Sequence, residues 1–211
     1  MILKTFSNNL RGRQIALILI PVLIAFLGSM KVAVAYEKYG IRGKIAPELD
    51  LQGWIDGNGR DRKPLKLSDL RGKIIYLYFF QAWCPGCQSH GFPTLKTLSE
   101  RFGSNANVAF VAVQTVFEGF HFNTRAKLRE SQLTYGIRVP MAHDAGTPGE
   151  DHLPTTMRRY RSGGTPWTVI IDHSGTVVYN QFHIEVEQAT VMIQDLIQKR
   201  LIHLNEVEKD G

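Results

Sequence analysis

Two long apolar runs dominate the pattern of hydrophobic and polar positions along this chain. Residues 74–80 read IIYLYFF and residues 108–113 read VAFVAV, and neither run contains a charged side chain. Uninterrupted, β-prone runs of this length are typical of strands that are covered on both faces of a sheet. The pattern therefore predicts a sheet whose central strands are buried on both sides.

Segments with helical spacing follow each run. Apolar residues recur at helical intervals between positions 95 and 102, and Pro93 is expected to kink or restart this helix. Residues 124–135 are predicted to form a polar surface helix. A short extended segment over residues 137–141 and a loop rich in Gly, Pro, His and Thr are expected after it.

The last part of the chain predicts a hairpin and an amphipathic helix. Two β-prone segments at residues 167–172 and 176–180 flank the turn sequence Asp172-His173-Ser174-Gly175, which is a good hairpin signal. The order strand, helix, strand, helix, hairpin, helix predicts an α/β domain with a mixed sheet. One face of the final predicted helix collects the apolar residues Ala189, Met192, Ile193, Leu196 and Ile197.

The N-terminus has the pattern of an export signal. The first 35 residues contain four basic and no acidic side chains, an apolar stretch over residues 15–27, and the small-residue sequence Ala33-Val34-Ala35. A cleaved signal peptide over residues 1–35 is therefore predicted. The alternative is an uncleaved membrane anchor that spans residues 15–30. Either leader would deliver the domain to a periplasmic or other extracytoplasmic location, free or anchored to the inner membrane.

The length and the charge of the chain limit the number of domains and the classes of partner. A chain of 211 residues accommodates one domain and a leader. We expect a linker over residues 36–44, a domain over residues 45–205 and a C-terminal tail over residues 206–211. The formal net charge is +6, but subtracting the four leader cations from the 25 basic residues leaves 21 against 19 acidic ones. A nearly neutral domain argues against nucleic acid as a partner.

The two cysteines of the sequence form the motif Cys84-Pro85-Gly86-Cys87 shortly after the first apolar run. A helix that starts at Pro85 would direct backbone N–H groups at Cys84 and favour its thiolate. Cys84 is therefore the expected nucleophile and Cys87 the expected resolving thiol of a thiol–disulfide exchange reaction. The alternatives are weaker, because a structural disulfide would close only a very short loop and a zinc site would need further cysteine ligands.

Three motifs carry a resemblance to a known family: Trp83-Cys84-Pro85-Gly86-Cys87, Thr165-Pro166, and Asp172 followed by Gly175. With them, the chain resembles the exported TlpA/ResA-like thiol–disulfide oxidoreductases of the thioredoxin superfamily from about residue 45 to residue 201. The resemblance implies a thioredoxin fold, in which helices flank a central mixed sheet and a helical insertion precedes the strand that follows a cis-proline.

The resemblance also implies roles for individual residues. Cys84 would attack a substrate disulfide, and Cys87 would displace the product thiol from the resulting mixed disulfide. Pro166 would be the cis-proline, the backbone of Thr165 would pair with a bound substrate strand, and Trp83 would offer an apolar contact beside the sulfur. An ordinary trans-proline and a plain core tryptophan are the alternative interpretations.

Two positions depart from the family pattern. Tyr78 stands six residues before the first cysteine, where many thioredoxins carry a buried acid. His90 stands three residues after the second cysteine, where TlpA/ResA-like proteins often have glutamate, and one extra residue precedes Pro93. His90 could serve as a proton shuttle because imidazole titrates near neutral pH. An exposed helical histidine is the alternative.

These observations predict an exported thiol–disulfide oxidoreductase that reduces protein disulfides, with neither a cofactor nor a metal. Its expected partners are disulfide-bearing exported proteins and a membrane thiol donor that reduces the pair again. A disulfide oxidase or isomerase would use the same cysteines and differ in reduction potential. A copper-binding metallochaperone on the same fold is a further alternative because soft thiolates favour Cu(I). Peroxidase chemistry is disfavoured, since Gln81 stands where peroxiredoxins place an activating hydroxyl.

Overall fold

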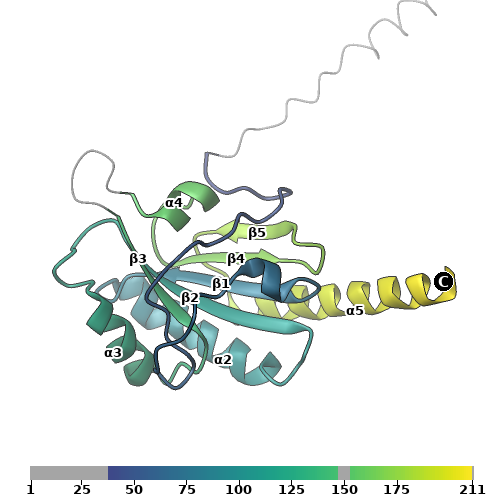
Figure 1. The fold of residues 1–211 in the computed structure, drawn as a ribbon, viewed down its shortest axis with the longest axis horizontal. Coiled ribbons are helices and arrows are strands. Elements are labelled where there is room, and N and C mark those ends of the chain that lie inside the picture. Colours follow the sequence, from purple (N-terminus) through teal and green to yellow (C-terminus); the bar gives the residue numbers. More distant parts are fainter. Residues whose placement is uncertain (1–37, 147–152, 211) are drawn as a thin grey trace, which may run out of the picture. The chain divides into compact units, whose positions relative to one another are not determined.

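The computed structural model describes residues 38–146 and 153–210, which contain one five-stranded mixed sheet (Figure 1). The order of the strands across the sheet is β3-β2-β1-β4-β5, with parallel pairing among the first three and antiparallel pairing of β4 with β1 and β5. This mixed sheet confirms the prediction from the sequence. The strands are β1 (Ile74–Phe80), β2 (Val108–Val116), β3 (Met141–Ala145), β4 (Trp167–Ile171) and β5 (Val177–Gln181).

Helices connect the strands and close the domain. The helical insertion that the resemblance implies lies between β2 and β4, where the structure has two helices, α3 and α4, around β3. The α5 face predicted from the apolar spacing is buried, because Ala189, Ile193 and Leu196 are at most 6% exposed. The helical segments are the 3₁₀ turn η1 (Leu67–Leu70), the π-helical turn η2 (Cys87–Gly91), α2 (Phe92–Phe102), α3 (Arg125–Tyr135), α4 (Thr155–Tyr160) and α5 (Val186–Asp210).

Strand β1 is buried on both faces, but by different kinds of structure. Tyr78 and Phe80 belong to one core cluster together with buried residues of α2 and α5. Leu77 and Phe79 point the other way and belong to a second cluster, which is built mainly from the segment 41–67 and neighbouring strands. Both faces are covered, as the apolar run predicts, although the segment over the second face is largely irregular.

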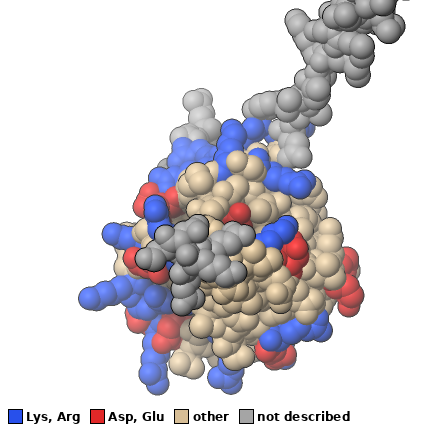
Figure 2. All heavy atoms as spheres, turned by 90° about the vertical axis from the view of Figure 1, so that its right-hand side faces the viewer, with Lys and Arg blue, Asp and Glu red and all other residues tan. Residues whose placement is uncertain are grey.

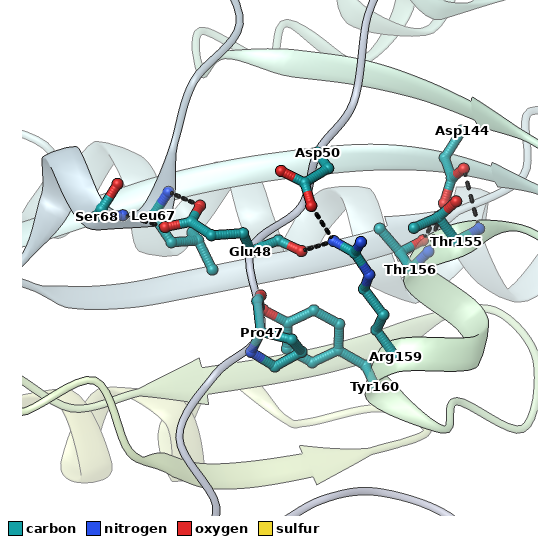
Figure 3. A network of polar contacts seen from close by, with 10 residues as sticks. All are labelled: Pro47, Glu48, Asp50, Leu67, Ser68, Asp144, Thr155, Thr156, Arg159 and Tyr160. Carbon is teal, nitrogen blue, oxygen red and sulfur yellow. Dashed lines mark hydrogen bonds and ion pairs between the residues drawn. The ribbon is translucent and has the colours of Figure 1, made fainter.

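Polar contacts tie this irregular segment to α4 (Figure 3). The Arg159 guanidinium donates to the Glu48 carbonyl oxygen at 2.5 Å and to the Asp50 carboxylate at 2.6 Å. The Tyr160 hydroxyl donates to the Pro47 carbonyl oxygen at 2.7 Å. Because α4 shortly precedes the segment that enters β4, these contacts hold that approach in place.

The N-terminal end of α4 is capped from the end of β3. One carboxylate oxygen of Asp144 accepts the Thr155 backbone N–H at 3.2 Å, and the other accepts the Thr156 N–H at 2.7 Å and the Thr156 hydroxyl at 2.5 Å (Figure 3). Asp144 is only 5% exposed, so these bonds satisfy a buried charge that also favours a helix N-terminus. The cap explains how a helix of six residues is stabilised here.

Two predicted segment boundaries differ from the observed ones. The described part of the expected linker packs on the domain: Ile41 is buried, the Gly43 N–H donates to Val177, and the Val177 N–H donates to Lys44. Helix α5 continues to Asp210, beyond the expected boundary at residue 205. The predicted leader over residues 1–35 lies outside the described residues. Among the helices that the structure describes, none is long and apolar enough to cross a membrane.

The insertion was the least accurately predicted region. Helix α3 begins at Arg125 after Thr124, as expected, and ends at Gly136, which has a left-handed φ of 64°. Strand β3 starts at Met141, the last residue of the extended segment expected over residues 137–141. Helix α4 was not predicted. The sequence of β3, MAHDA, lacks an apolar run, and its strand conformation depends on parallel pairing with β2.

Charged side chains of both signs share the domain surface. On the face drawn in Figure 2, Lys and Arg side chains are interspersed with Asp and Glu. This distribution agrees with the near balance of charges expected for the part of the chain after the leader.

Candidate active site

The two cysteines lie at the carboxyl end of β1, where the chain turns into a helix. A turn follows Phe80, in which the Cys84 N–H donates to the Gln81 carbonyl oxygen at 3.2 Å. Helical structure begins at Pro85, and the Gln88 N–H donates to the Cys84 carbonyl oxygen at 3.1 Å. Proline suits the first helical position because no donor is lost there. The strand thus delivers Cys84 to a helix N-terminus, as the sequence predicts.

The surroundings of the two sulfurs are unequal. Both cysteines are free thiols; Cys84 is 8% exposed and Cys87 is completely buried. The Cys87 backbone N–H donates to the Cys84 sulfur at 3.3 Å. Hydrogen bonds, above all the one from the Cys87 thiol, lower the pKa of Cys84 to about 6 even though burial acts against them. Burial, assisted by the hydrogen bond to Cys84, raises the pKa of Cys87 far above its ordinary value.

The segment before β4 lies directly against Cys84. The Thr165–Pro166 peptide bond is cis, as the resemblance implies, and the Cys84 sulfur lies 3.5 Å from the Thr165 carbonyl oxygen. Gly86 permits this approach, because a Cβ atom on it would lie 3.2 Å from Cδ of Pro166. The structure therefore brings together four residues that the sequence analysis selected from two distant segments: Cys84, Cys87, Thr165 and Pro166.

Trp83 lies on the solvent side of the site. Its side chain is 43% exposed, so it is not the plain core residue considered as the alternative. Trp83 and Phe122, which is 57% exposed, line a groove of about 240 Å³ that also includes residues of α3. Exposed aromatic side chains that line a groove are suited to contact an apolar part of a substrate, and Trp83 directly precedes Cys84 in the chain.

Asn123 holds the turn before Cys84, and the sequence analysis did not identify this role. The buried Asn123 side chain accepts the Ala82 N–H at 2.7 Å and donates to the Gln81 side-chain oxygen at 3.2 Å. The same amide group also donates to the carbonyl oxygens of Glu118 and Gly119. No local sequence signal marks this function, because the partners lie about 40 residues apart and meet only in the folded domain.

His90 lies on the exposed surface of η2. Its Nδ1 is 2.7 Å from the Ser89 hydroxyl, and its ring centroid is 5.9 Å from that of His183. Burial lowers the pKa of His183, although the neighbouring Glu185 carboxylate acts in the opposite direction. The role of His90 as a proton shuttle stays a hypothesis.

The extra residue before Pro93 is accommodated in η2. A π-helical turn holds one residue more than an α-helical turn, and such turns are often found at functional sites. Within it, Gly91 is buried next to the Tyr78 hydroxyl. Tyr78 is also completely buried, and its hydroxyl donates to the Cys87 carbonyl oxygen at 3.4 Å. Tyr78, one of the two departures from the family pattern, thus packs against the turn that holds the extra residue, next to Cys87.

Comparisons with known proteins agree with this geometry. Residues 42–180 match the model of the AhpC/TSA family. The thiol–disulfide oxidoreductase ResA of Bacillus subtilis is 30% identical over 159 residues, which cover 74% of this chain and 77% of that protein. A ResA of Bacillus cereus is 26% identical over 196 residues, which cover 92% of this chain and 97% of that protein.

Solved structures show the same architecture. The thioredoxin-like superfamily protein SPOA0173 superposes with a TM-score of 0.64 at 33% identity and covers 72% of this chain and 95% of its own. A thiol-disulfide isomerase from Corynebacterium glutamicum also has a TM-score of 0.64, at 30% identity, with 73% of this chain and 96% of its own covered. The chain therefore belongs to the AhpC/TSA family and is a thiol–disulfide oxidoreductase of the thioredoxin superfamily, similar to the ResA proteins.

Proposed function

We propose that the protein reduces disulfide bonds of exported proteins through Cys84 and Cys87. The observation that carries this proposal is the inequality of the two thiols: Cys84 reaches the surface with a pKa of about 6, whereas Cys87 is buried with a raised pKa. At neutral pH, Cys84 is then largely a thiolate and Cys87 a thiol. This is the state that a dithiol reductase needs before it meets a disulfide.

The reaction proceeds in two exchange steps. The Cys84 thiolate attacks one sulfur of the substrate disulfide, which forms a mixed disulfide and releases the other substrate sulfur as a thiolate that takes up a proton. Cys87 then loses its proton and attacks the Cys84 sulfur, which forms the Cys84–Cys87 disulfide and releases the second substrate thiol. Two electrons pass from the protein to the substrate; Cys87 supplies one of the two protons that the substrate thiols take up, and solvent supplies the other.

The surroundings of Cys84 support the expected substrate contacts. The carbonyl oxygen of Thr165 lies 3.5 Å from the Cys84 sulfur. The backbone of Thr165, which Pro166 follows, would therefore hold an extended substrate segment next to this sulfur. Trp83, at 43% exposure, would cover an apolar residue of the same segment. Backbone pairing combined with one apolar contact suits a range of protein substrates, because neither depends strongly on the substrate sequence.

The reducing direction is supported by the pKa of Cys84. A value of about 6 lies closer to that of thioredoxin, roughly 7, than to that of the oxidant DsbA, roughly 3.5. A less stabilised thiolate gives a lower reduction potential and a better reductant. Outside the cytoplasm, where the sequence of residues 1–35 would direct the chain, a membrane thiol donor must then return the pair to the reduced state.

The reduction potential of the Cys84–Cys87 pair tests the proposal. The full chain is equilibrated in graded thiol buffers, the free thiols are trapped, and Cys87→Ser serves as the control that has no reversible couple. A potential near roughly −270 mV supports the reductase, whereas one near roughly −120 mV would identify an oxidase and one near roughly −180 mV an isomerase. Failure of the wild-type chain to form a reversible couple would refute the redox function.

A further inference from the structure

The Tyr78 hydroxyl lies in the core beside the resolving cysteine. Tyr78 is completely buried, and its ring packs on Phe80 and Phe92 at centroid distances of 5.8 and 5.6 Å. The hydroxyl lies 3.4 Å from the Cys87 carbonyl oxygen. Burial is the main cause that raises the pKa of Cys87, and a hydrogen bond from Tyr78 to this thiol acts in the opposite direction. The hydroxyl thus lies next to the resolving cysteine and donates to its carbonyl oxygen in the reduced protein.

Gly91 keeps the space for this hydroxyl. A Cβ atom at Gly91 would overlap the Tyr78 hydroxyl and ring. The backbone of Gly91 has φ −63° and ψ −51°, an ordinary helical conformation that any residue adopts. Glycine is unfavourable inside a helix, so its value here is the space that it leaves rather than its conformational freedom. The π-helical turn carries this residue to the point where the hydroxyl enters.

The Tyr78 hydroxyl can donate a proton in a hydrogen bond but cannot remove one from Cys87. Burial raises the pKa of Tyr78 well above its ordinary value, so the phenol stays protonated at physiological pH. A buried thiolate without a donor would be costly, since a charge in apolar surroundings must be hydrogen-bonded. The hydroxyl is therefore placed to stabilise the thiolate form of Cys87 when it appears.

We propose that Tyr78 is a catalytic residue of the resolving step, whose hydroxyl donates a hydrogen bond to the Cys87 thiolate while Gly91 keeps it in reach. In that step Cys87 gives its proton to the substrate thiolate released first. Its sulfur then bonds to the Cys84 sulfur, and the bond between Cys84 and the substrate breaks. The inference rests on the proposed function and adds a residue that acts in the second exchange only.

Ellman's reagent separates the two exchanges. Attack by Cys84 releases one thionitrobenzoate and leaves a mixed disulfide, and attack by Cys87 releases the second. Stopped-flow absorbance of the full, reduced chain therefore gives two rates. We expect Tyr78→Phe to slow the second phase about tenfold, the effect of losing one hydrogen bond to a charged group, and to leave the first unchanged.

Tyr76→Phe is the matched control. Tyr76 lies two residues away on the same face of β1 and is 1% exposed, and its hydroxyl is 3.4 Å from the Thr168 hydroxyl instead. We expect both phases to keep their wild-type rates in this variant. The inference would be overturned if the second phase of Tyr78→Phe had the same rate as that of the wild type. It would also be overturned if Tyr76→Phe slowed the second phase as much as Tyr78→Phe does. Loss of the first phase from the wild type would refute the proposed function itself.

A second variant covers the case in which Tyr78→Phe does not fold. Incorporation of 3-fluorotyrosine at position 78 keeps the ring and the hydroxyl but makes the phenol more acidic and a stronger donor. The second phase should then become faster with an unchanged first phase. A second phase at or below the wild-type rate would contradict the role of the hydroxyl.

Discussion

The outer and the inner half of the active site contain the same functional group in opposite surroundings. The outer half, around Cys84, Trp83 and Thr165, borders solvent, and the Cys84 sulfur accepts hydrogen bonds from the thiol and the backbone N–H of Cys87. The inner half, around Cys87 and Tyr78, is completely buried. One turn of helix separates the two cysteines, yet the pKa of one is lowered and that of the other raised. Surroundings, rather than residue type, therefore assign the nucleophile and the resolving thiol.

The comparison has a consequence for the order of events. A thiol that is ionised and accessible reacts first with an incoming disulfide. A buried thiol with a raised pKa is protected from outside reagents and reacts with the one sulfur it can reach. In the proposed reaction, a mixed disulfide on Cys84 therefore forms before the inner half takes part.

Loss of the outer thiol should have the largest effect. We expect Cys84→Ser to reduce the rate of disulfide reduction by roughly three orders of magnitude or more, because the nucleophile itself is removed. The readout is reduction of a model protein disulfide with the wild-type chain in parallel. Cys87→Ser is the companion variant and should still perform the first exchange and accumulate the mixed disulfide. Residual turnover of Cys84→Ser close to wild type would break the assignment of roles.

The pH profile of Cys84 alkylation sharpens the difference between the halves. Alkylation follows the thiolate, so its rate should rise with pH and reach half of its maximum near pH 6. Since the hydrogen bond from the Cys87 thiol is the largest cause of the lowered pKa, Cys87→Ala should move the profile to higher pH. Cys87→Ser retains a donor and should move it less. Superimposable profiles for all three proteins would contradict this origin of the low pKa.

Close packing of the inner half can be tested through stability. Gly91→Ala introduces a Cβ atom where the Tyr78 ring lies, so we expect the free energy of unfolding to fall by about 1–3 kcal/mol. Urea unfolding of the reduced protein measures it. Ser89→Ala, on the exposed side of the same turn, should change stability by no more than about 0.5 kcal/mol. An unchanged or higher stability of Gly91→Ala would show that the inner half is loosely packed.

The smallest effect is expected at the outer rim. Trp83→Ala removes an exposed aromatic contact, so we expect KM for a protein disulfide to rise roughly fivefold while kcat changes little. Reaction of Cys84 with a small disulfide should keep its wild-type rate. Equal losses with large and small substrates would indicate that Trp83 acts on the sulfur rather than on the substrate.

The elements that the sequence predicted well are those with a strong local pattern. The apolar run of β1, the turn before β5 and the apolar face of α5 each reflect a periodicity within one element. The CxxC motif likewise indicated its chemistry, because the two cysteines, the proline and the preceding strand are adjacent in the chain. The resemblance then implied that Pro166 is cis and lies against the CxxC pair, and the structure shows the cis bond and places Pro166 next to Gly86.

Elements whose stability comes from distant partners were predicted poorly. Helix α4 has six residues and depends on the Asp144 cap, and β3 depends on pairing with β2. The segment 41–67 has little regular structure, yet it covers one face of the sheet. Asn123 acquires its role from the turn at Ala82. Such contacts leave no period in the sequence, because each depends on where two distant segments meet.

The sequence alone determined the α/β class, the position of the dithiol at the end of a buried strand, and which two sulfurs are expected to react. Tertiary structure decided how strongly the two thiols differ, because the pKa values depend on burial and on donors that folding brings together. It also decided that Gly91, which the sequence analysis did not single out, lies against Tyr78, one of the two departures from the family pattern, next to Cys87. A pattern within one helix or strand is visible in the sequence, whereas a hydrogen bond in the core forms only after folding has brought its two distant partners together.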